Sequence, residues 1–273
     1  MSDAKMKSDP ICLRVKGPFA CFTRPEFHVE RVSYPVITPS AARGIFEAIL
    51  MKPIEKPEAH KRHNKIGFRW VITRIGIVNK GTMFSILRNE LGYPTHQKPE
   101  NATGYDINGD RIRAQRHSLI LKDVEYYIEG VIEVPAETRL RGEQSNRRPS
   151  AEFLARNKYH QMFLRRARAG QCFYQPFFGC REFSVTEWEI TDDPPDRIAG
   201  PSENENFGMI FRDFDFEPMW SRWQPSEEQS KTRSPIVQRP HDGWDQPGQR
   251  PVPKHFAAQA VNGWINVGKE PQV

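Results

Sequence analysis

Basic side chains gather between positions 139 and 168, and their chemistry is that of phosphate binding. This stretch holds nine lysines and arginines against two acids, a local charge of +7 in a chain of net charge +6. A concentrated positive face is what binding of a polyanion such as RNA requires. The alternative is a solvated helix whose arginines pair with residues 185–230, where twelve acids stand against three arginines.

Arg43 is a second candidate contact for a phosphate group. It lies near the start of a helix predicted over residues 39–52, where a hydroxyl N-cap and Pro39 precede apolar residues at the spacing i, i+3, i+4, i+7. Pro53 ends that helix. Backbone donors at a helix N-terminus and a nearby guanidinium can together hold a phosphate. The alternative is that this segment is only the first helix of an α+β domain.

The basic stretch continues into a second predicted helix, residues 151–169, which Gly170 ends at a C′ position. Lys158, Gln161 and Arg165 share one face of it at the spacing i, i+3, i+7. The neighbouring face carries Tyr159, Phe163 and Arg166. This helix therefore presents basic and aromatic groups together.

The side chains that commonly bind metals are poorly arranged for that role. His60 and His63 have basic neighbours, and no carboxylate or cysteine follows them at ligand spacing. A basic loop resting on RNA or DNA is the better interpretation of this charged insertion, residues 54–67. The four cysteines form no CxxC pair and no zinc-ligand pattern, so we expect reduced thiols. The sequence predicts neither a metal nor a cofactor.

The elements that position these residues alternate between strands and helices. Strands are predicted at 11–22 with a turn at Gly17-Pro18, at 27–38, at 68–78, and as a pair within 116–134 joined at Lys122-Asp123. This pattern predicts an α+β fold whose first domain, residues 11–171, is ferredoxin-like (RRM-like). Aromatic-rich strands in residues 172–223 predict a small antiparallel β-sheet companion domain. Residues 224–273, rich in proline and glycine, are predicted to be a disordered tail.

The composition favours a soluble protein. The chain has 273 residues, 37% of them hydrophobic, with a mean hydropathy of −0.69 and a pI near 9.2. No run approaches the roughly 18 to 20 apolar residues that a membrane helix needs. The first ten residues contain lysines but no apolar segment of the kind a secretory signal has. We therefore expect a cytoplasmic location and no membrane partner.

Three segments in order carry a resemblance to a known family. They read ACFTRPEFHVERVSYPVITPSAARGIFEAI, FSILRNE and MFLRRARAGQCFYQPFFGCREF, within residues 12–216. They are similar to the signature segments of the CRISPR-associated protein of type I-C systems, which is subtype d of the fifth Cas family in the repeat-associated (RAMP) superfamily. The insertion at 54–67 and the residues after about 224 lie outside the resemblance.

The resemblance implies a ferredoxin-like domain with a small β-domain attached. It implies an endoribonuclease that cuts precursor CRISPR RNA beside the repeat hairpin, remains on the 5′ handle, and assembles with the large and backbone subunits of the type I-C surveillance complex (Cascade). It also implies metal-independent chemistry, in which the ribose 2′-OH attacks the adjacent phosphate. Such a reaction needs a base, a cation for the crowded phosphorane and an acid for the leaving oxygen.

Carried over residue by residue, the family's site changes at two positions. A tyrosine commonly precedes Trp-Lys-Pro in the family, whereas this chain reads Leu50-Met51-Lys52-Pro53. A lysine followed by histidine is typical on the second helix, whereas here the run is Lys158-Tyr159-His160. Lys158 would stabilise phosphate charge, and Tyr159 or His160 would serve as base or acid. Tyr34 and His117 are weaker substitutes. The expected nucleic-acid contacts are Arg43, Arg147, Arg148, Arg165, Arg166 and Arg168.

Two further functions stay open at this point. Because leucine at position 50 cannot move a proton, the chain could be a non-catalytic subunit that binds the CRISPR RNA handle while another nuclease cuts. The basic stretch and the insertion could also bind double-stranded DNA irrespective of its sequence.

Overall fold

The computed structural model describes residues 6–27, 29–52, 67–91, 113–134, 153–215 and 252–267. Its strands are β1 Met6–Lys7, β2 Ile11–Ala20, β3 Arg31–Val32, β4 Arg69–Asn79, β5 Thr82–Leu91, β6 Arg113–Val134, β7 Glu187–Ile190, β8 Asn206–Asp215, β9 Val252–Val261 and β10 Trp264–Asn266. Its helical segments are α1 Pro39–Ile49, a π-helical turn η2 Leu154–Tyr159, and α4 His160–Arg168. The α+β class is confirmed, with antiparallel sheet as the larger part.

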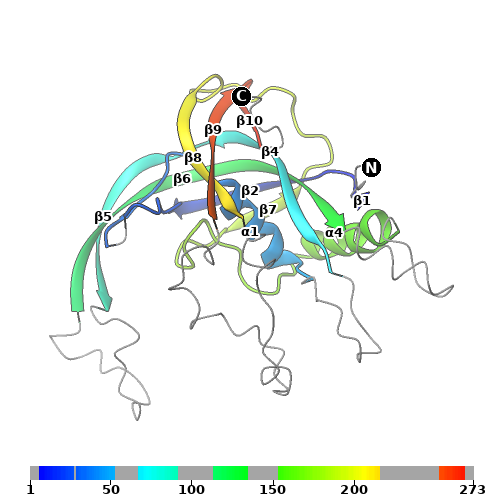
Figure 1. Ribbon diagram of the computed structural model, residues 1–273, viewed down its shortest axis with the longest axis horizontal. Coiled ribbons are helices and arrows are strands. Elements are labelled where there is room, and N and C mark those ends of the chain that lie inside the picture. Colours follow the sequence, from blue (N-terminus) through cyan, green and yellow to red (C-terminus); the bar gives the residue numbers. More distant parts are fainter. Residues whose placement is uncertain are drawn as a thin grey trace, which may run out of the picture.

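The strands form one curved sheet in the order β7-β2-β6-β4-β10-β9-β8, and β1, β3 and β5 also pair with β6. These pairs are antiparallel except for β3 with β6. The 22-residue strand β6 organises the sheet, because β5 pairs with its first half and β4 with its second half. Figure 1 shows α1 and α4 lying together beneath the same face of the sheet.

Two turns predicted from the sequence are absent, because both strands continue through them. Strand β2 runs past Gly17-Pro18, and β6 runs past Lys122-Asp123. The two irregularities share one level of the sheet: Gly17 pairs with Val124 and Phe19 with Lys122, which leaves Pro18 opposite Asp123. Proline donates no hydrogen bond, and Asp123 has the positive φ of 60°. The Gly-Pro and Lys-Asp signals therefore mark a local irregularity inside paired strands and not chain reversals.

The predicted first helix is confirmed, together with its cap. The Thr38 hydroxyl accepts a hydrogen bond from the backbone N–H of Ala41, and Pro39 occupies the first helical position. Buried Ile45, Phe46 and Ile49 form the stripe that faces the sheet. The helix ends with an extended residue, Leu50.

The second helix is confirmed over the described part of its predicted range. It begins as the π-helical turn η2 and continues as α4, and Gly170 ends it with a φ of 64°. Leu154, Ala155, Tyr159, Phe163 and Ala167 are its buried residues. They place the basic residues of this helix on its outer side.

An aromatic junction, formed by Phe46, Phe68, Trp70, Tyr159 and Phe163, joins both helices to β4. The Phe46 and Phe163 rings stack with centroids 5.2 Å apart, and Trp70 lies 4.8 Å from Phe46 and 4.7 Å from Phe163. Tyr159 lies 4.8 Å from Phe68. The Trp70 indole donates a hydrogen bond to the Leu50 carbonyl at 2.9 Å. All five junction side chains are buried, so their packing fixes the position of α4 relative to α1.

Residues 252–267 differ from the predicted disordered tail, since they form β9 and β10 within the sheet. The hairpin turns at Asn262 and Gly263, whose φ values of 54° and 80° match the turn that Asn-Gly favours. Phe256, Ala258 and Ala260 alternate as buried residues. Strand β7 pairs with β2 of the first predicted domain. The proposed domain boundaries after residues 171 and 223 stay predictions.

Removing one junction ring should destabilise the whole fold. We expect Phe163→Ala to lower the free energy of unfolding by about 3–5 kcal/mol, because it leaves a cavity beside the rings of Phe46 and Trp70. Urea unfolding followed by tryptophan fluorescence measures the change. Leu87→Ala, at a side chain that is 56% exposed on β5, is the matched control and should change stability by less than about 0.5 kcal/mol. Equal losses in both variants would contradict the role given to the junction.

Candidate nucleic-acid interface

The outer side of α4 carries the most accessible of the predicted arginines. Arg165 and Arg168 are exposed, and Arg166 is half-buried. The guanidinium of Arg168 donates to the Asp192 carboxylate at 3.3 Å, although both side chains remain largely in solvent. The Nε atom of Arg166 is buried and has no hydrogen-bond partner among the described residues. The apolar residues of the helix pack inward, which leaves guanidinium groups on its outer side, where phosphate binding needs them.

Arg43 is held by two carboxylates, which reduces its capacity to bind phosphate. Its Nε and Nη2 donate to Asp213 of β8 at 2.9 and 3.1 Å, and its Nη1 donates to Glu47 at 2.5 Å. Burial alone would lower the pKa of Arg43, but the charges of Glu47 and Asp213 raise it. A phosphate at this position would have to compete with both acids. The assignment of Arg43 as a nucleic-acid contact stays a prediction.

Lys158 and Tyr159 lie together but in opposite surroundings. The side chain of Lys158 is exposed, and its Nζ lies 5.9 Å from the centre of the Tyr159 ring. Tyr159 is only 5% exposed and packs on Phe68. Burial raises the pKa of the Tyr159 hydroxyl, so it keeps its proton at neutral pH. Lys158 is therefore available to a phosphate, while Tyr159 is buried and stays protonated.

His160 faces a different side of the helix from Tyr159, as its one-residue offset of about 100° requires. It is half-buried and lines a pocket of about 240 Å³ together with Arg74, Glu129 and Asp192. Its Nδ1 is buried and has no hydrogen-bond partner among the described residues. Burial lowers the pKa of His160, and the charge of Asp9 opposes that shift. The imidazole is therefore neutral near pH 7 and able to accept a proton.

The two positions that differ from the family pattern, Leu50 and Tyr159, each contact one of two neighbouring aromatic residues on or just before β4. Leu50 is buried and its carbonyl accepts the hydrogen bond from Trp70, while Tyr159 packs on Phe68. Phe68 and Trp70 are neighbours, with centroids 5.7 Å apart. The C-terminal end of α1 and the turn η2 are thus brought to the same place, which the order of the segments alone does not reveal.

The remaining predicted residues fall elsewhere. Arg147 and Arg148 lie outside the described residues, as do His60 and His63. Tyr34 is buried, with the Arg24 guanidinium 5.0 Å from its ring, and burial raises the pKa of its hydroxyl. His117 is exposed on β6 opposite Leu87 of β5.

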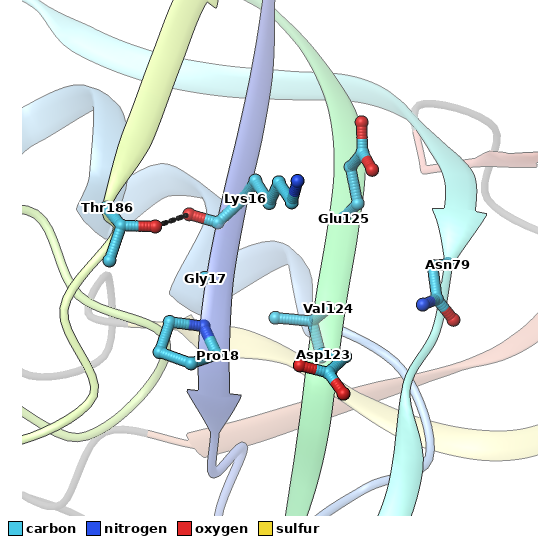
Figure 2. A pocket seen from close by; sticks show the side chains of 8 residues that line it. All are labelled: Lys16, Gly17, Pro18, Asn79, Asp123, Val124, Glu125 and Thr186. Atoms are coloured by element: carbon cyan, nitrogen blue, oxygen red, sulfur yellow. Dashed lines mark hydrogen bonds between the residues drawn. The ribbon is translucent and has the colours of Figure 1, made fainter.

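A larger pocket, of about 320 Å³, is a poorer candidate for binding a polyanion. Figure 2 shows it between β2, β4 and β6, with Lys16 beside Glu125 and with Asp123 below. One cation faces two carboxylates there, so the local charge is unfavourable for phosphate. The described lining residues include none of the predicted site residues.

Sequence reasoning missed an exposed aromatic pair at the end of the arginine helix. Residues 172–190 were expected to form strands, but the strand in this region is restricted to β7. Phe173 is 83% exposed, and Tyr174 lies beside it at 6.1 Å between ring centroids. The backbone N–H of Phe173 donates to the Ala48 carbonyl at 2.7 Å, which fixes the pair next to α1. Exposed rings beside arginines are suited to stacking on unpaired bases.

Comparisons with known proteins identify the family of this chain. A family model described as "CRISPR-associated protein (Cas_Cas5)", subtype Cas5d, matches residues 11–267. A curated protein of Thermus thermophilus named "CRISPR pre-crRNA endoribonuclease Cas5d" is 39% identical over 193 residues, which is 69% of either chain. A protein of the same name from Mannheimia succiniciproducens is 38% identical over 218 residues, covering 76% of this chain and 85% of that one.

These matches define the class as a CRISPR-associated protein of the Cas5 group. A solved structure described as "Crystal Structure of CRISPR-associated Protein" has the same general fold, with a TM-score of 0.54 at 19% identity, covering 98% of this chain and 96% of that one. The chain belongs to the Cas5d family. The resemblance noted from its sequence segments is confirmed.

The described residues contain no helix that is both long and apolar enough to cross a membrane. Within the same residues, no group of three or more His, Cys, Asp or Glu side chains is placed to hold a metal ion.

The different surroundings of Arg43 and Arg165 predict unequal losses of stability when either side chain is removed. We expect Arg43→Ala to lower the free energy of unfolding by about 1–3 kcal/mol, because it removes charged hydrogen bonds and leaves two half-buried carboxylates unpaired. Arg165→Ala, at an exposed position, should stay within about 0.5 kcal/mol of the unchanged protein. Urea unfolding measures both. If Arg43→Ala proves neutral, its carboxylate contacts do not hold in solution.

Proposed function

We propose that this chain is a CRISPR precursor-RNA endoribonuclease that remains bound to the 5′ handle of its product. The observation that carries the proposal is family membership across residues 11–267, together with the relatives named as pre-crRNA endoribonucleases. The exposed guanidinium groups of α4 support it, because a handle-binding protein needs accessible cations. The partners in this proposal are CRISPR repeat RNA and the large and backbone subunits of the type I-C Cascade complex.

The ferredoxin-like assignment is part of the same proposal. Supporting it, β7-β2-β6-β4 are adjacent in the sheet with antiparallel neighbours, α1 lies between β2 and β4 in the chain, and α4 lies between β6 and β7. This is the βαββαβ order that RNA-recognition domains use. The C-terminal hairpin β9-β10 and strand β8 extend that sheet beyond β4.

The proposed chemistry is metal-independent attack of the 2′-OH on the adjacent phosphate. Lys158 is the cation that stabilises charge on the phosphorane, because its ammonium is exposed. His160 is the proposed base and Tyr159 the proposed acid, since burial lowers the pKa of the first and raises that of the second. In-line displacement places attacking and leaving oxygens on opposite sides of the phosphorus, so base and acid need not face the same atom.

Cleavage without metal is the direct test. We expect the purified protein in EDTA to cut its own repeat RNA once, at the base of the hairpin. Lys158→Ala should slow single-turnover cleavage by about 10²-fold or more, because the developing charge loses its cation. Arg197→Ala, an exposed side chain that pairs with Glu203, is the matched control and should cut at the normal rate. RNA that stays intact while binding is saturated would refute the catalytic part.

The pH dependence of cleavage tests the two proton-transfer residues. A base must be unprotonated, so the rate should fall as pH drops through the pKa of His160, which lies below its ordinary value. We expect His160→Gln to lower the rate by about 10²–10⁴-fold and to remove this acid limb. Tyr159→Phe keeps the ring on Phe68 and should lower the rate while leaving the acid limb in place. An unchanged profile in His160→Gln excludes it as the base.

The second candidate function is a non-catalytic subunit that binds the handle and assembles the complex. It is favoured by Leu50, which is buried and offers no proton at the position where the family commonly has tyrosine. Saturable, hairpin-specific binding without cleavage would identify this case. Binding to double-stranded DNA is a weaker variant, and it would show equal affinity for unrelated sequences with steep loss of affinity as salt increases.

A further inference from the structure

Two cysteines that are 159 positions apart in the sequence meet where β2 ends. The Sγ of Cys180 lies 3.6 Å from the carbonyl oxygen of Cys21 and 3.8 Å from the Thr23 hydroxyl, which is itself 3.6 Å from the Sγ of Cys21. The backbone segments are tightly joined, because the N–H of Cys21 donates to the Phe178 carbonyl at 3.0 Å. Both thiols are reduced, and the two residues differ in access: Cys21 is fully buried, whereas Cys180 is partly exposed.

Hydrogen bonds to the Cys180 sulfur, and after them the charge of Arg31, favour its thiolate. The Arg31 guanidinium donates from Nη1 to the Cys180 Sγ at 3.4 Å. Hydrogen bonding from Cys21, and next from Thr23, together with the charge of Arg31, lowers the pKa of Cys180 to about 6, against the opposing effects of burial and Glu182. The pKa of Cys21 is raised by its contact with Cys180 and by burial, so this thiol stays protonated. The pair therefore combines an accessible nucleophile with a protonated neighbour.

We propose that Cys180 and Cys21 form a redox-sensitive pair, in which Cys180 is the attacking thiolate and Cys21 the resolving thiol. The Cys180 thiolate attacks one sulfur of a small disulfide RS–SR, which forms a mixed disulfide and releases RS⁻. Cys21 then gives its proton to the released RS⁻. The resulting Cys21 thiolate attacks the Cys180 sulfur, which releases the second RS⁻. Two protein thiols become one disulfide while one small disulfide is reduced to two thiols.

The fold gives this step a structural consequence. Gly179 has a φ of 80°, and a Cβ at that position would lie 2.0 Å from the Cys21 carbonyl oxygen. Only glycine fits at position 179, and it lets the backbone before Cys180 lie directly against the Cys21 carbonyl. The bond would tie the segment that follows the arginine helix α4 to the end of β2 by a covalent link.

Treatment of the full chain with oxidised glutathione tests the pair. We expect free thiols, counted after denaturation, to fall from four to two per chain, peptide mapping to find a Cys21–Cys180 link, and dithiothreitol to reverse both changes. Cys21→Ser should stop at a glutathione adduct on Cys180. Cys172→Ser is the matched control, because Cys172 is also partly exposed, and it should still form the link.

A second measurement does not depend on any variant folding. In the unchanged protein, iodoacetamide at pH 7 should label Cys180 at least about tenfold faster than Cys172, because only the thiolate reacts. Equal labelling rates, or a persistent glutathione adduct on Cys180 without the link to Cys21, would overturn the proposal.

Discussion

The contact between two helices through aromatic rings is the constraint on which this structure depends. Phe46 of α1 and Phe163 of α4 stack on each other, and Trp70 of β4 contacts both. Rings of this size bury large apolar areas and tolerate few arrangements, so they fix the distance and the rotation of the helices. The rotation of α4 decides which of its residues reach solvent. Exposed Arg165 and buried Tyr159 are two results of the same packing.

The acidic region of the chain determines which arginines remain available. Asp213 of β8 binds Arg43, and Asp192 contacts Arg168. Pairing of the basic helix with the acidic stretch is the alternative to polyanion binding, and the contact of Arg168 with Asp192 is an instance of it; Arg43 lies outside the basic stretch 139–168. The Arg168 pair is exposed and worth little, whereas the Arg43–Asp213 pair is half-buried and has two charged hydrogen bonds, with a third from Arg43 to Glu47. Among the described residues, the outer face of α4 therefore keeps guanidinium groups available for the proposed RNA contact.

Local patterns in the sequence predicted the helices well, and long-range pairing explains what they missed. Thr38, Pro39 and Gly170 mark helix ends through contacts within a few residues, so their signals can be seen without a structure. Gly17-Pro18 and Asp123 look like turns because the partner strand that keeps each segment within the sheet is distant in sequence. Asn262-Gly263 is a recognisable turn signal. The strand before it, β9, has alanines at its buried positions 258 and 260, and alanine has little intrinsic strand preference. Likewise, no spacing reveals that Asp213 reaches Arg43.

The same junction connects fold to chemistry. Tyr159 owes its raised pKa to burial against Phe68, and His160, one residue later, is turned away toward a pocket that leaves its Nδ1 without a partner among the described residues. A loosened junction would let water reach Tyr159 and would change the orientation of His160 at the same time. Substitutions at Phe68 or Phe163 would then alter the surroundings of the two residues proposed to transfer protons. The packing that stabilises the core therefore also sets the surroundings of the proposed acid–base pair, and a change in one is expected to change the other.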